Sequence, residues 1–276
     1  MVNMKMTLKS HLSHDKENDR VYLMEMHADD FPQIILYMDK LARTKKYTKV
    51  FAKVPVKYGP AFLNSEYRIE ASIPCFYDGQ EDALFLAKYF SEERKQPDKD
   101  ALNAFSLLLL EPASTNALAP LDQDYKLRPL KESDAVSMAS LFKKVFISYP
   151  FPVFDPAFII KSIKEDGTRY FGIFHDEKLV AVSSAECSQK GKNAEMTDFA
   201  VFPTHRGKKL ATHLLAFMEE ELSNDGYQTF YTIARICSLA MNKTFYDRGY
   251  KYSGTLTQNT QISGKIESMN VWYKRI

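Results

Sequence analysis

The stretch VFPTHRGKKLATHLLAFMEEEL, residues 201–222, begins as an apolar strand, breaks at Pro203 and continues as an amphipathic helix. Four basic residues lie where the strand becomes the helix: His205, Arg206, Lys208 and Lys209. Like charges this close repel one another, so we expect the cluster to have an anionic partner. The competing interpretation is a solvated turn that tolerates lysine at any position.

The composition is that of an ordinary soluble globular protein, with 45% hydrophobic and 26% charged residues. A chain of 276 residues exceeds the usual size of one domain, so two compact domains are expected. The net charge of +2 means that any basic feature is local. Nucleic-acid binding needs a broad cationic face and is therefore not expected.

The sequence predicts a cytoplasmic protein without a metal site or a membrane segment. The three cysteines are far apart and form no CxxC pair, and His11 and His14 have no neighbouring metal ligands. No run of about 18 apolar residues occurs, and the amino terminus lacks a secretory signal. The sequence leaves the oligomeric state open, a homodimer included.

Composition shifts divide the chain into a flexible tail, two domains and a linker. We expect the tail at 1–20, an N-terminal α/β domain at 21–110, a linker rich in proline and small polar residues at 111–124, and a larger C-terminal domain at 125–276.

The C-terminal domain alternates strand and helix patterns. Strands are expected at 125–130, 169–175, 178–187, 193–203, 227–234, 250–256 and 267–276, and helices at 131–150, 156–167, 208–226 and 238–249. This order predicts an α/β (α+β) fold, in which helices flank a mixed central sheet.

The N-terminal domain gives a shorter version of the same order. Strands are expected at 20–27 and 49–55, helices at 29–47 and 56–67, and a closing hairpin at 68–77 and 82–90. The strand, helix, strand pattern of 48–73 matches that of 227–256, with aromatic residues at comparable places. We therefore consider a degenerate internal half-repeat, in which the first copy lacks the basic turn.

The amino terminus of a helix offers unpaired N–H groups and a partial positive charge, which together suit a phosphate. Here Gly207 also allows the backbone to approach a ligand closely. The basic turn is therefore a candidate pyrophosphate site.

The order strand, RGKKLA, helix, strand, N…FYDRGY, strand resembles the acyl-CoA binding core of the GNAT superfamily of N-acetyltransferases over residues 125–276. The family pattern is Gln or Arg, two residues, Gly, one residue, then Gly or Ala. Arg206 and Ala211 match it, but Lys209 stands where glycine is usual. The resemblance implies acetyl-CoA as co-substrate, bound by Arg206, Gly207, Lys208, Lys209, Leu210 and Ala211.

A closer resemblance, spanning both domains, is to the β-lysine N6-acetyltransferase family. The segments that carry it are FYDGQEDALFLAKYFSEER, AEMTDFAVFPTHRGKKLA, ARICSLAMNKTFYDRGYKYSGTL and ISGKIESMNVWYK. It implies acetylation of the side-chain amine of β-lysine. The product would be a compatible solute that has lost one positive charge.

An alkyl ammonium with a pKa near 10.4 costs roughly 4–5 kcal/mol to deprotonate at neutral pH, so a base is useful. Glu195 lies where GNAT enzymes often carry a glutamate base that acts through water, and Asp198 is the alternative. Strand alternation predicts Glu195 and Asp198 on opposite faces. The competing role for both is a carboxylate that pairs with a lysine at a strand edge.

The leaving thiolate needs a proton, and Tyr246 matches the general acid of many GNAT enzymes. The competing role for Tyr246 is that of a core aromatic. By the same resemblance Asn242, four residues earlier on the helix, contacts the CoA arm, although a plain surface asparagine is the alternative. Backbone N–H groups of Phe199 or Val201 are expected where two central parallel strands separate, and they would polarise the acetyl carbonyl.

A diamino acid also needs partners for its carboxylate and its second ammonium. The candidates are Arg235 and Asp198, with Glu267 or Asn270 as substitutes and polar groups on a loop at 257–268. Two rival functions stay open. One is a GNAT enzyme for a polyamine, another amino acid or a protein amine, and the other is a non-catalytic acyl-CoA-binding module.

Overall fold

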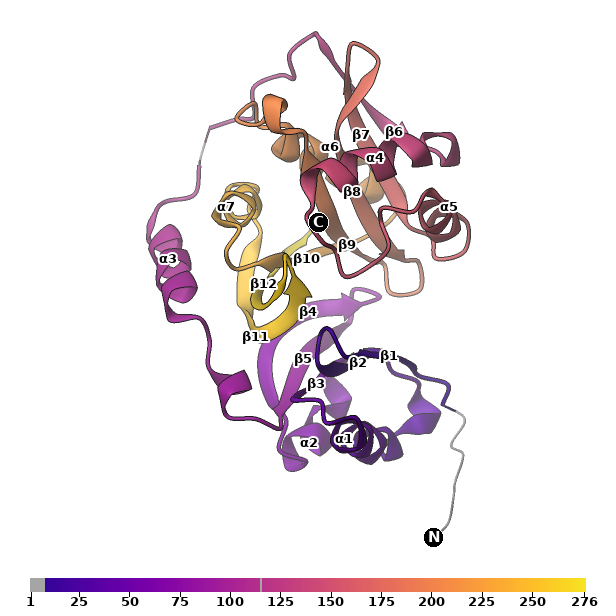
Figure 1. The fold of residues 1–276 in the computed structure, drawn as a ribbon, viewed down its shortest axis with the longest axis vertical. Coiled ribbons are helices and arrows are strands. Elements are labelled where there is room, and N and C mark those ends of the chain that lie inside the picture. Colours follow the sequence, from indigo (N-terminus) through magenta and orange to yellow (C-terminus); the bar gives the residue numbers. More distant parts are fainter. Residues whose placement is uncertain (1–7, 115) are drawn as a thin grey trace.

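The computed structural model describes residues 8–114 and 116–276, which form two α/β halves, each built on its own sheet (Figure 1). The N-terminal half contains β1 (His11–Asp15), β2 (Arg20–Glu25), α1 (Gln33–Lys45), β3 (Lys49–Pro55), α2 (Gly59–Asn64), β4 (Arg68–Tyr77) and β5 (Glu81–Tyr89). Helix α3 (Lys99–Leu110) then runs along one side of the molecule toward the C-terminal half.

The C-terminal half contains β6 (Tyr125–Leu130), α4 (Ala135–Val145), α5 (Pro156–Lys164), β7 (Arg169–His175), β8 (Lys178–Ser188), β9 (Asn193–Val201), α6 (Leu210–Asn224), β10 (Thr229–Arg235), α7 (Leu239–Asp247), β11 (Lys251–Ile262) and β12 (Lys265–Arg275). Its seven strands follow the order β11-β12-β10-β9-β8-β7-β6. The predicted mixed sheet with flanking helices is confirmed.

Helices and the N-terminal half share the two faces of the seven-stranded sheet. Helices α3, α6 and α7 bury one face, with Phe105, Leu214 and Phe245 in the same core. On the other face, α4 and α5 cover the strands from β6 to β9. The N-terminal sheet covers the remaining strands, with Phe51 and Phe85 packed against Val271.

The predicted helix at 131–150 is shorter in the structure. It opens with a 3₁₀ turn at Glu132–Asp134, and α4 ends at Val145. Pro150 and Pro152 follow closely, and a residue before proline is disfavoured in helical conformation. The residues between α4 and α5 are therefore not helical. Among them, Tyr149, Phe151 and Val153 lie on the face that the two halves share.

The two sheets repeat the same connectivity. In the first, β2 runs parallel to β3, β3 pairs antiparallel with β5, and β5 pairs with β4. In the second, β9, β10, β12 and β11 have the same order and the same directions. The strands equivalent to β3 and β4 are β10 and β11, as the predicted half-repeat requires.

The prediction of a flexible tail at 1–20 is wrong for the part from His11 onward. Strand β1 pairs antiparallel with β2 from His11↔Glu25 to Asp15↔Arg20. Polar residues hide this strand in the sequence, because β1 lies at the sheet edge and most of its side chains are exposed or half-buried. Residues 1–7 lie outside the described residues, as does residue 115 of the predicted linker.

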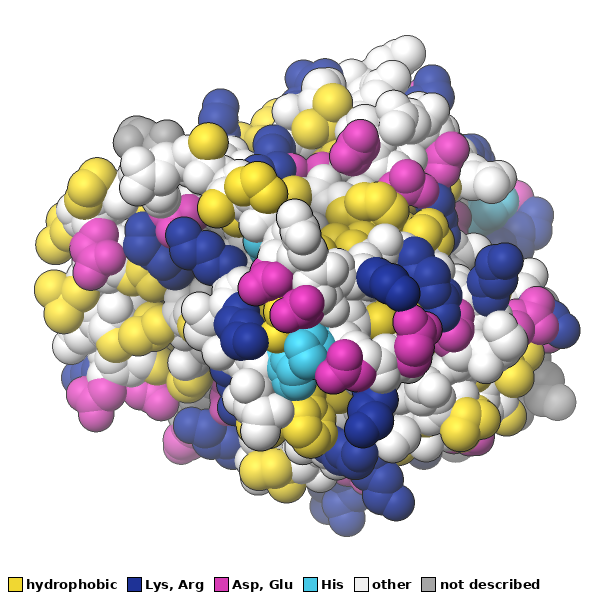
Figure 2. All heavy atoms as spheres, turned by 90° about the horizontal axis from the view of Figure 1, so that it is seen from above, with side chains coloured by type: hydrophobic (Ala, Val, Ile, Leu, Met, Phe, Trp, Pro, Cys, Tyr) yellow, Lys and Arg dark blue, Asp and Glu magenta, His cyan; other side chains and the backbone are white. Residues whose placement is uncertain are grey.

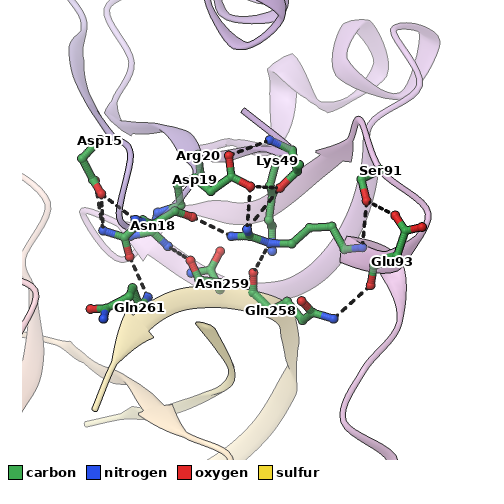
Figure 3. A network of polar contacts seen from close by, with 12 residues as sticks. Asp15, Asn18, Asp19, Arg20, Lys49, Ser91, Glu93, Gln258, Asn259 and Gln261 are labelled. Carbon is green, nitrogen blue, oxygen red and sulfur yellow. Dashed lines mark hydrogen bonds and ion pairs between the residues drawn. The ribbon is translucent and has the colours of Figure 1, made fainter. Parts of the chain in front are cut away.

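A row of buried cations holds the N-terminal half to β11 (Figure 3). Lys49 Nζ donates to the carbonyl oxygen of Thr257 at 2.7 Å, and Arg94 Nε donates to that of Gln258 at 2.8 Å. Arg20 donates to the carbonyl oxygen of Asn259. Three successive carbonyls are therefore bound by two side chains of the N-terminal sheet, Arg20 and Lys49, and by Arg94 in the 3₁₀ turn after β5.

This arrangement corrects the prediction of a polar substrate loop at 257–268. Most of that segment belongs to β11 and β12, with a tight turn at Ser263 and Gly264 between them. The polar groups around residues 257–261 bind the N-terminal half instead. No helix among the residues described is long and apolar enough to cross a membrane.

Candidate active site

The basic turn leads into α6 with its backbone donors unused. Within the described residues, the N–H groups of residues 207–211 donate no hydrogen bond, and no side chain caps α6. Gly207 has a φ of +80°, and nothing lies within 4 Å of the place where a Cβ would stand. The turn thus presents open backbone and free donors, which are what a phosphate group needs at a helix amino terminus.

Only part of the predicted basic cluster carries charge toward solvent. Tyr125 OH lies 2.9 Å from His205 Nδ1 and accepts from Lys208 Nζ at 2.8 Å. Burial, His175 and Lys208 lower the pKa of His205, so its ring is neutral at pH 7. No sequence pattern connects Tyr125 with the turn, because it lies 80 residues before His205.

Figure 2 looks down on the end of the molecule that is uppermost in Figure 1 and shows how charge is distributed there. Lysine and arginine side chains alternate with acidic ones around a histidine patch and form no continuous basic face. Positive charge is therefore interspersed with negative charge on this face, as a net charge of +2 suggests.

The backbone conformation of Lys209 explains why glycine is usual at this position of the family pattern. Its φ of 56° and ψ of 24° are left-handed, a conformation that costs an L-residue roughly 1–2 kcal/mol and glycine almost nothing. The departure from the family pattern therefore keeps the backbone shape at a small cost. The side chain of Lys209 is exposed.

The central strands separate as predicted. β9 and β10 pair in parallel only from Asn193↔Thr229 to Glu195↔Tyr231, although both strands continue beyond that point. Phe202 N donates to Val180 O of β8 at 2.8 Å. Because N–H groups alternate in direction along a strand, those of Phe199 and Val201 point away from β8, into the gap between β9 and β10. These are the two donors expected at the gap.

A β-bulge corrects the predicted faces of β9. The register between β8 and β9 shifts between Val182 and Ser184, where Asp198 has a φ of 56°. The extra residue reverses the alternation, so Asp198 lies with Glu195 on the face shared with the N-terminal half. Strand periodicity alone placed these two carboxylates on opposite faces.

Three carboxylates gather on that face. Glu186 on β8 is the register partner of Glu195 on β9, and Asp198 follows at the bulge. Asp198 accepts hydrogen bonds from Ser184 Oγ at 2.5 Å and from Tyr149 OH. Glu186 and Tyr149 were not predicted from the sequence, since neither lies near a family motif.

Desolvation by the surrounding protein raises the pKa of all three carboxyl groups, of which Glu195 and Asp198 are half-buried and Glu186 is more exposed. For Asp198, hydrogen bonds from hydroxyl groups offset part of the rise. For Glu195, Lys53 and Tyr231 offset part of it, while the charge of Asp198 adds to it. For Glu186, desolvation by the surrounding protein acts first, and the charges of Glu195 and Asp198 raise the pKa further.

A cavity of about 500 Å³ opens over Glu186 and Asp198, between the two halves of the chain. Lys53 of the N-terminal half lines it together with Glu186, Asp198 and Tyr231. Phe151, Val153 and Phe158 form an apolar wall on the side of α5. A larger hollow of about 780 Å³, around Arg169 and Asp225, contains none of the predicted site residues.

Tyr246 lies on α7 with its ring 5.9 Å from that of Trp272. Its neighbour Phe245 is the residue that faces β9, with its ring 5.7 Å from Phe199. The hydroxyl of Tyr246 donates no hydrogen bond within the described part of the chain. The assignment of Tyr246 as general acid therefore stays a prediction.

Asn242 and Asn270, two residues predicted to contact ligands, are hydrogen-bonded to each other. Asn242 is fully buried, and its Nδ2 donates to the carbonyl oxygens of Arg235 and Ser238, both at 2.9 Å. Its Oδ1 accepts from Asn270 Nδ2 and Trp272 Nε1, also at 2.9 Å. Asn242 and Asn270 thus bind each other inside the protein, and a contact of either residue with a ligand stays a prediction.

Arg235 lies at the end of β10, and Glu267 binds both Nε and NH2 of its guanidinium, at 2.9 and 2.8 Å. Glu267 is buried, whereas Arg235 keeps 32% of its side-chain surface exposed. The guanidinium is therefore already neutralised by Glu267. A role of Arg235 in holding an acceptor carboxylate stays a prediction.

The comparisons with known proteins agree with this geometry. The model of the Acetyltransferase (GNAT) family matches residues 136–250. A β-lysine N(6)-acetyltransferase of Methanococcus maripaludis is 38% identical over 262 residues, 93% of this chain and 93% of its own. N-acetyltransferase YodP of Bacillus subtilis is 29% identical over 96% and 95% of the two chains. A β-lysine N(6)-acetyltransferase of Methanosarcina mazei is 34% identical over 56% and 57%.

Proposed function

The chain belongs to the β-lysine N6-acetyltransferase family of GNAT enzymes, and we propose that it transfers the acetyl group of acetyl-CoA to the side-chain amine of β-lysine. The observation that carries the proposal is the cluster of Glu186, Glu195 and Asp198 beside the gap between β9 and β10. Such a cluster suits an acceptor with two ammonium groups.

The basic turn supports the co-substrate part of the proposal. The unused N–H groups of residues 207–211 and the side chains of Arg206 and Lys208 would hold the pyrophosphate of CoA. The N–H groups of Phe199 and Val201 in the gap would bind the carbonyl oxygen of the thioester. Acetyl-CoA supplies the activated acetyl group.

In the reaction the bond from the acetyl carbon to sulfur breaks, and a bond to the terminal nitrogen of the acceptor forms. The acceptor ammonium must first lose a proton. Asp198 lines the cavity and is held by Tyr149 and Ser184, so it would contact and orient the ammonium. Glu195 would take the proton through a water molecule, and its raised pKa makes it a stronger base.

The thiolate that leaves needs a proton in turn. Tyr246 is the candidate donor that the family resemblance implies, and its hydroxyl is not engaged by any described residue. The acetylated product has one ammonium and one carboxylate and so no net charge, as befits a compatible solute.

The test is an amine panel with the purified protein. β-Lysine, α-lysine, spermidine and a lysine-containing peptide are each supplied with acetyl-CoA, and free thiol and product mass are measured. We expect turnover of β-lysine with a mass gain of one acetyl group at the terminal amine. Turnover of another amine without turnover of β-lysine would reject the substrate, and CoA binding without any turnover would reject the enzyme.

A further inference from the structure

Strand β3 carries lysine residues in an otherwise apolar sequence, KVFAKVP. Lys49, Phe51 and Lys53 alternate along it and face the C-terminal half, since Phe51 belongs to the core between the two sheets. Lys49 is fully buried and bound by Glu70 at 3.0 Å. Lys53 instead lines the cavity.

Lys53 has no acidic partner among the described residues. Its ammonium donates to Tyr231 OH at 3.2 Å and lies 5.5 and 5.6 Å from the ring centroids of Tyr231 and Phe76. An ammonium has three donors, so two are left for another group. The cavity thus contains a cation that is placed by aromatic rings and has no counter-ion in contact.

Glu186 is the matching anion. It lines the same cavity and makes neither a hydrogen bond nor an ion pair with any described residue. Lys53 on β3 and Glu186 on β8 thus line one cavity from the two halves of the chain. The side chain of Glu186 is exposed and that of Lys53 is half-buried, so both charges are accessible to a ligand in the cavity.

We propose that Lys53 and Glu186 form a two-point clamp for the non-reacting end of the acceptor, Lys53 for its carboxylate and Glu186 for its second ammonium. The proposal rests on the proposed function. In β-lysine one methylene separates the carboxyl group from the carbon that bears the second amine, so its two charges need opposite partners close together. Three further methylenes lead to the reacting amine and suit the apolar wall of Phe151, Val153 and Phe158.

Other charged groups near the cavity are less suited to the clamp. Arg235 is already bound by Glu267 through two hydrogen bonds. Glu25 and Asp166 also line the cavity but come from β2 and from the segment after α5. Glu186 alone is in register with Glu195, where the gap begins.

The clamp gives the N-terminal half a function. Because Lys53 belongs to β3, the N-terminal sheet would supply the group that distinguishes an amino acid from a simple diamine. Catalytic groups and acyl-CoA contacts come from the C-terminal half, whereas acceptor selectivity is shared between the two.

Two analogues that each lack one charge test the clamp. 1,4-Diaminopentane is β-lysine without its carboxylate, and 6-aminohexanoate is β-lysine without its second amine. We compare kcat/KM of the wild-type enzyme, Lys53→Met and Glu186→Gln on all three acceptors. Lys45→Met is the matched control, since Lys45 is exposed on α1, away from the cavity.

Lys53→Met should lower kcat/KM for β-lysine about tenfold or more and leave that for 1,4-diaminopentane within about twofold. Glu186→Gln should lower kcat/KM for β-lysine to a similar extent and leave that for 6-aminohexanoate unchanged. Calorimetric binding of CoA verifies that each variant is folded.

The clamp would be overturned if Lys53→Met lowered kcat/KM equally for β-lysine and 1,4-diaminopentane, or if Glu186→Gln lowered it equally for β-lysine and 6-aminohexanoate. Such equal losses would indicate a structural role of the side chain. Unchanged kinetics on β-lysine in both variants would overturn it as well. Failure of the proposed function looks different, because the wild-type enzyme itself would then not acetylate β-lysine.

Discussion

Glu195 on β9 lies opposite Tyr231 on β10 as the last pair of the parallel ladder, and beyond this pair the two strands separate. The candidate base therefore stands at the vertex of the gap, beside the N–H groups that face it. Tyr231 also receives the hydrogen bond of Lys53, so this pair connects the ladder, the cavity and the N-terminal sheet.

Replacing Glu195 by Gln should lower kcat about 100-fold or more, because the general base that accepts the proton of the acceptor ammonium is lost. Burial raises the pKa of Glu195. The carboxylate accepts a proton only when ionised, so wild-type kcat should rise with pH through that raised pKa. Glu195→Gln should remove this rise, as measured by kcat from pH 5 to 9.

Asp198→Asn is the companion variant. Because Asp198 contacts the acceptor in our proposal, its loss should raise KM for β-lysine as well as lower kcat. If Asp198→Asn abolishes the pH dependence and Glu195→Gln keeps it, the two roles are exchanged.

Lys209 should contribute to CoA binding through its backbone. Lys209→Gly keeps the left-handed conformation at lower cost and should hold CoA affinity within about threefold. Lys209→Val opposes that conformation and should weaken CoA binding about tenfold or more. Calorimetry with CoA measures both, and equal weakening by the two variants would instead assign the contact to the lysine charge.

Asn242→Ala should destabilise the protein by about 2–4 kcal/mol, because it leaves Asn270 and Trp272 without their buried acceptor. Urea unfolding measures the loss. CoA affinity of the folded variant should stay unchanged. A folded variant of wild-type stability with weakened CoA binding would instead support the predicted contact of Asn242 with CoA.

Glu186→Gln should stabilise the free protein at high pH. The folded protein holds a proton on Glu186 to a higher pH than the unfolded chain does, so its free energy of unfolding falls as pH rises through the raised pKa. Glutamine cannot ionise, so the variant does not show this fall in the free energy of unfolding. The gain in melting temperature should be present at pH 9 and vanish near pH 4.

The control for this prediction is Glu177→Gln. Hydrogen bonding and attraction by Lys126 lower the pKa of Glu177, so its ionised form is favoured in the folded state. Its replacement should give no stabilisation at pH 9. A similar gain in both variants would mean that a general reduction of negative charge is responsible.

Local pattern determined most of the elements in advance. Apolar periodicity indicated the strands and helices of both halves, and the half-repeat was visible in 48–73 and 227–256 because equivalent strands bury equivalent faces. The basic turn was recognisable since its residues are consecutive in the chain. Features that depend on consecutive residues of one or two elements were therefore predictable from the sequence.

Side-chain orientation at the bulge was not predictable. One inserted residue at Asp198 reverses the faces that strand alternation assigns, and nothing in TDFAV marks it. The same holds for Asn242, whose four hydrogen bonds come from groups on β10, β12 and the start of α7.

The sequence by itself determined the basic turn before α6, the order of strands and helices along the chain, and the family. Only the tertiary structure decided which charges meet, because Lys53, Glu186 and Asp198 come from different strands of two sheets. Electrostatic interaction depends on distance in space and on burial, and a linear sequence specifies neither for residues more than 100 positions apart.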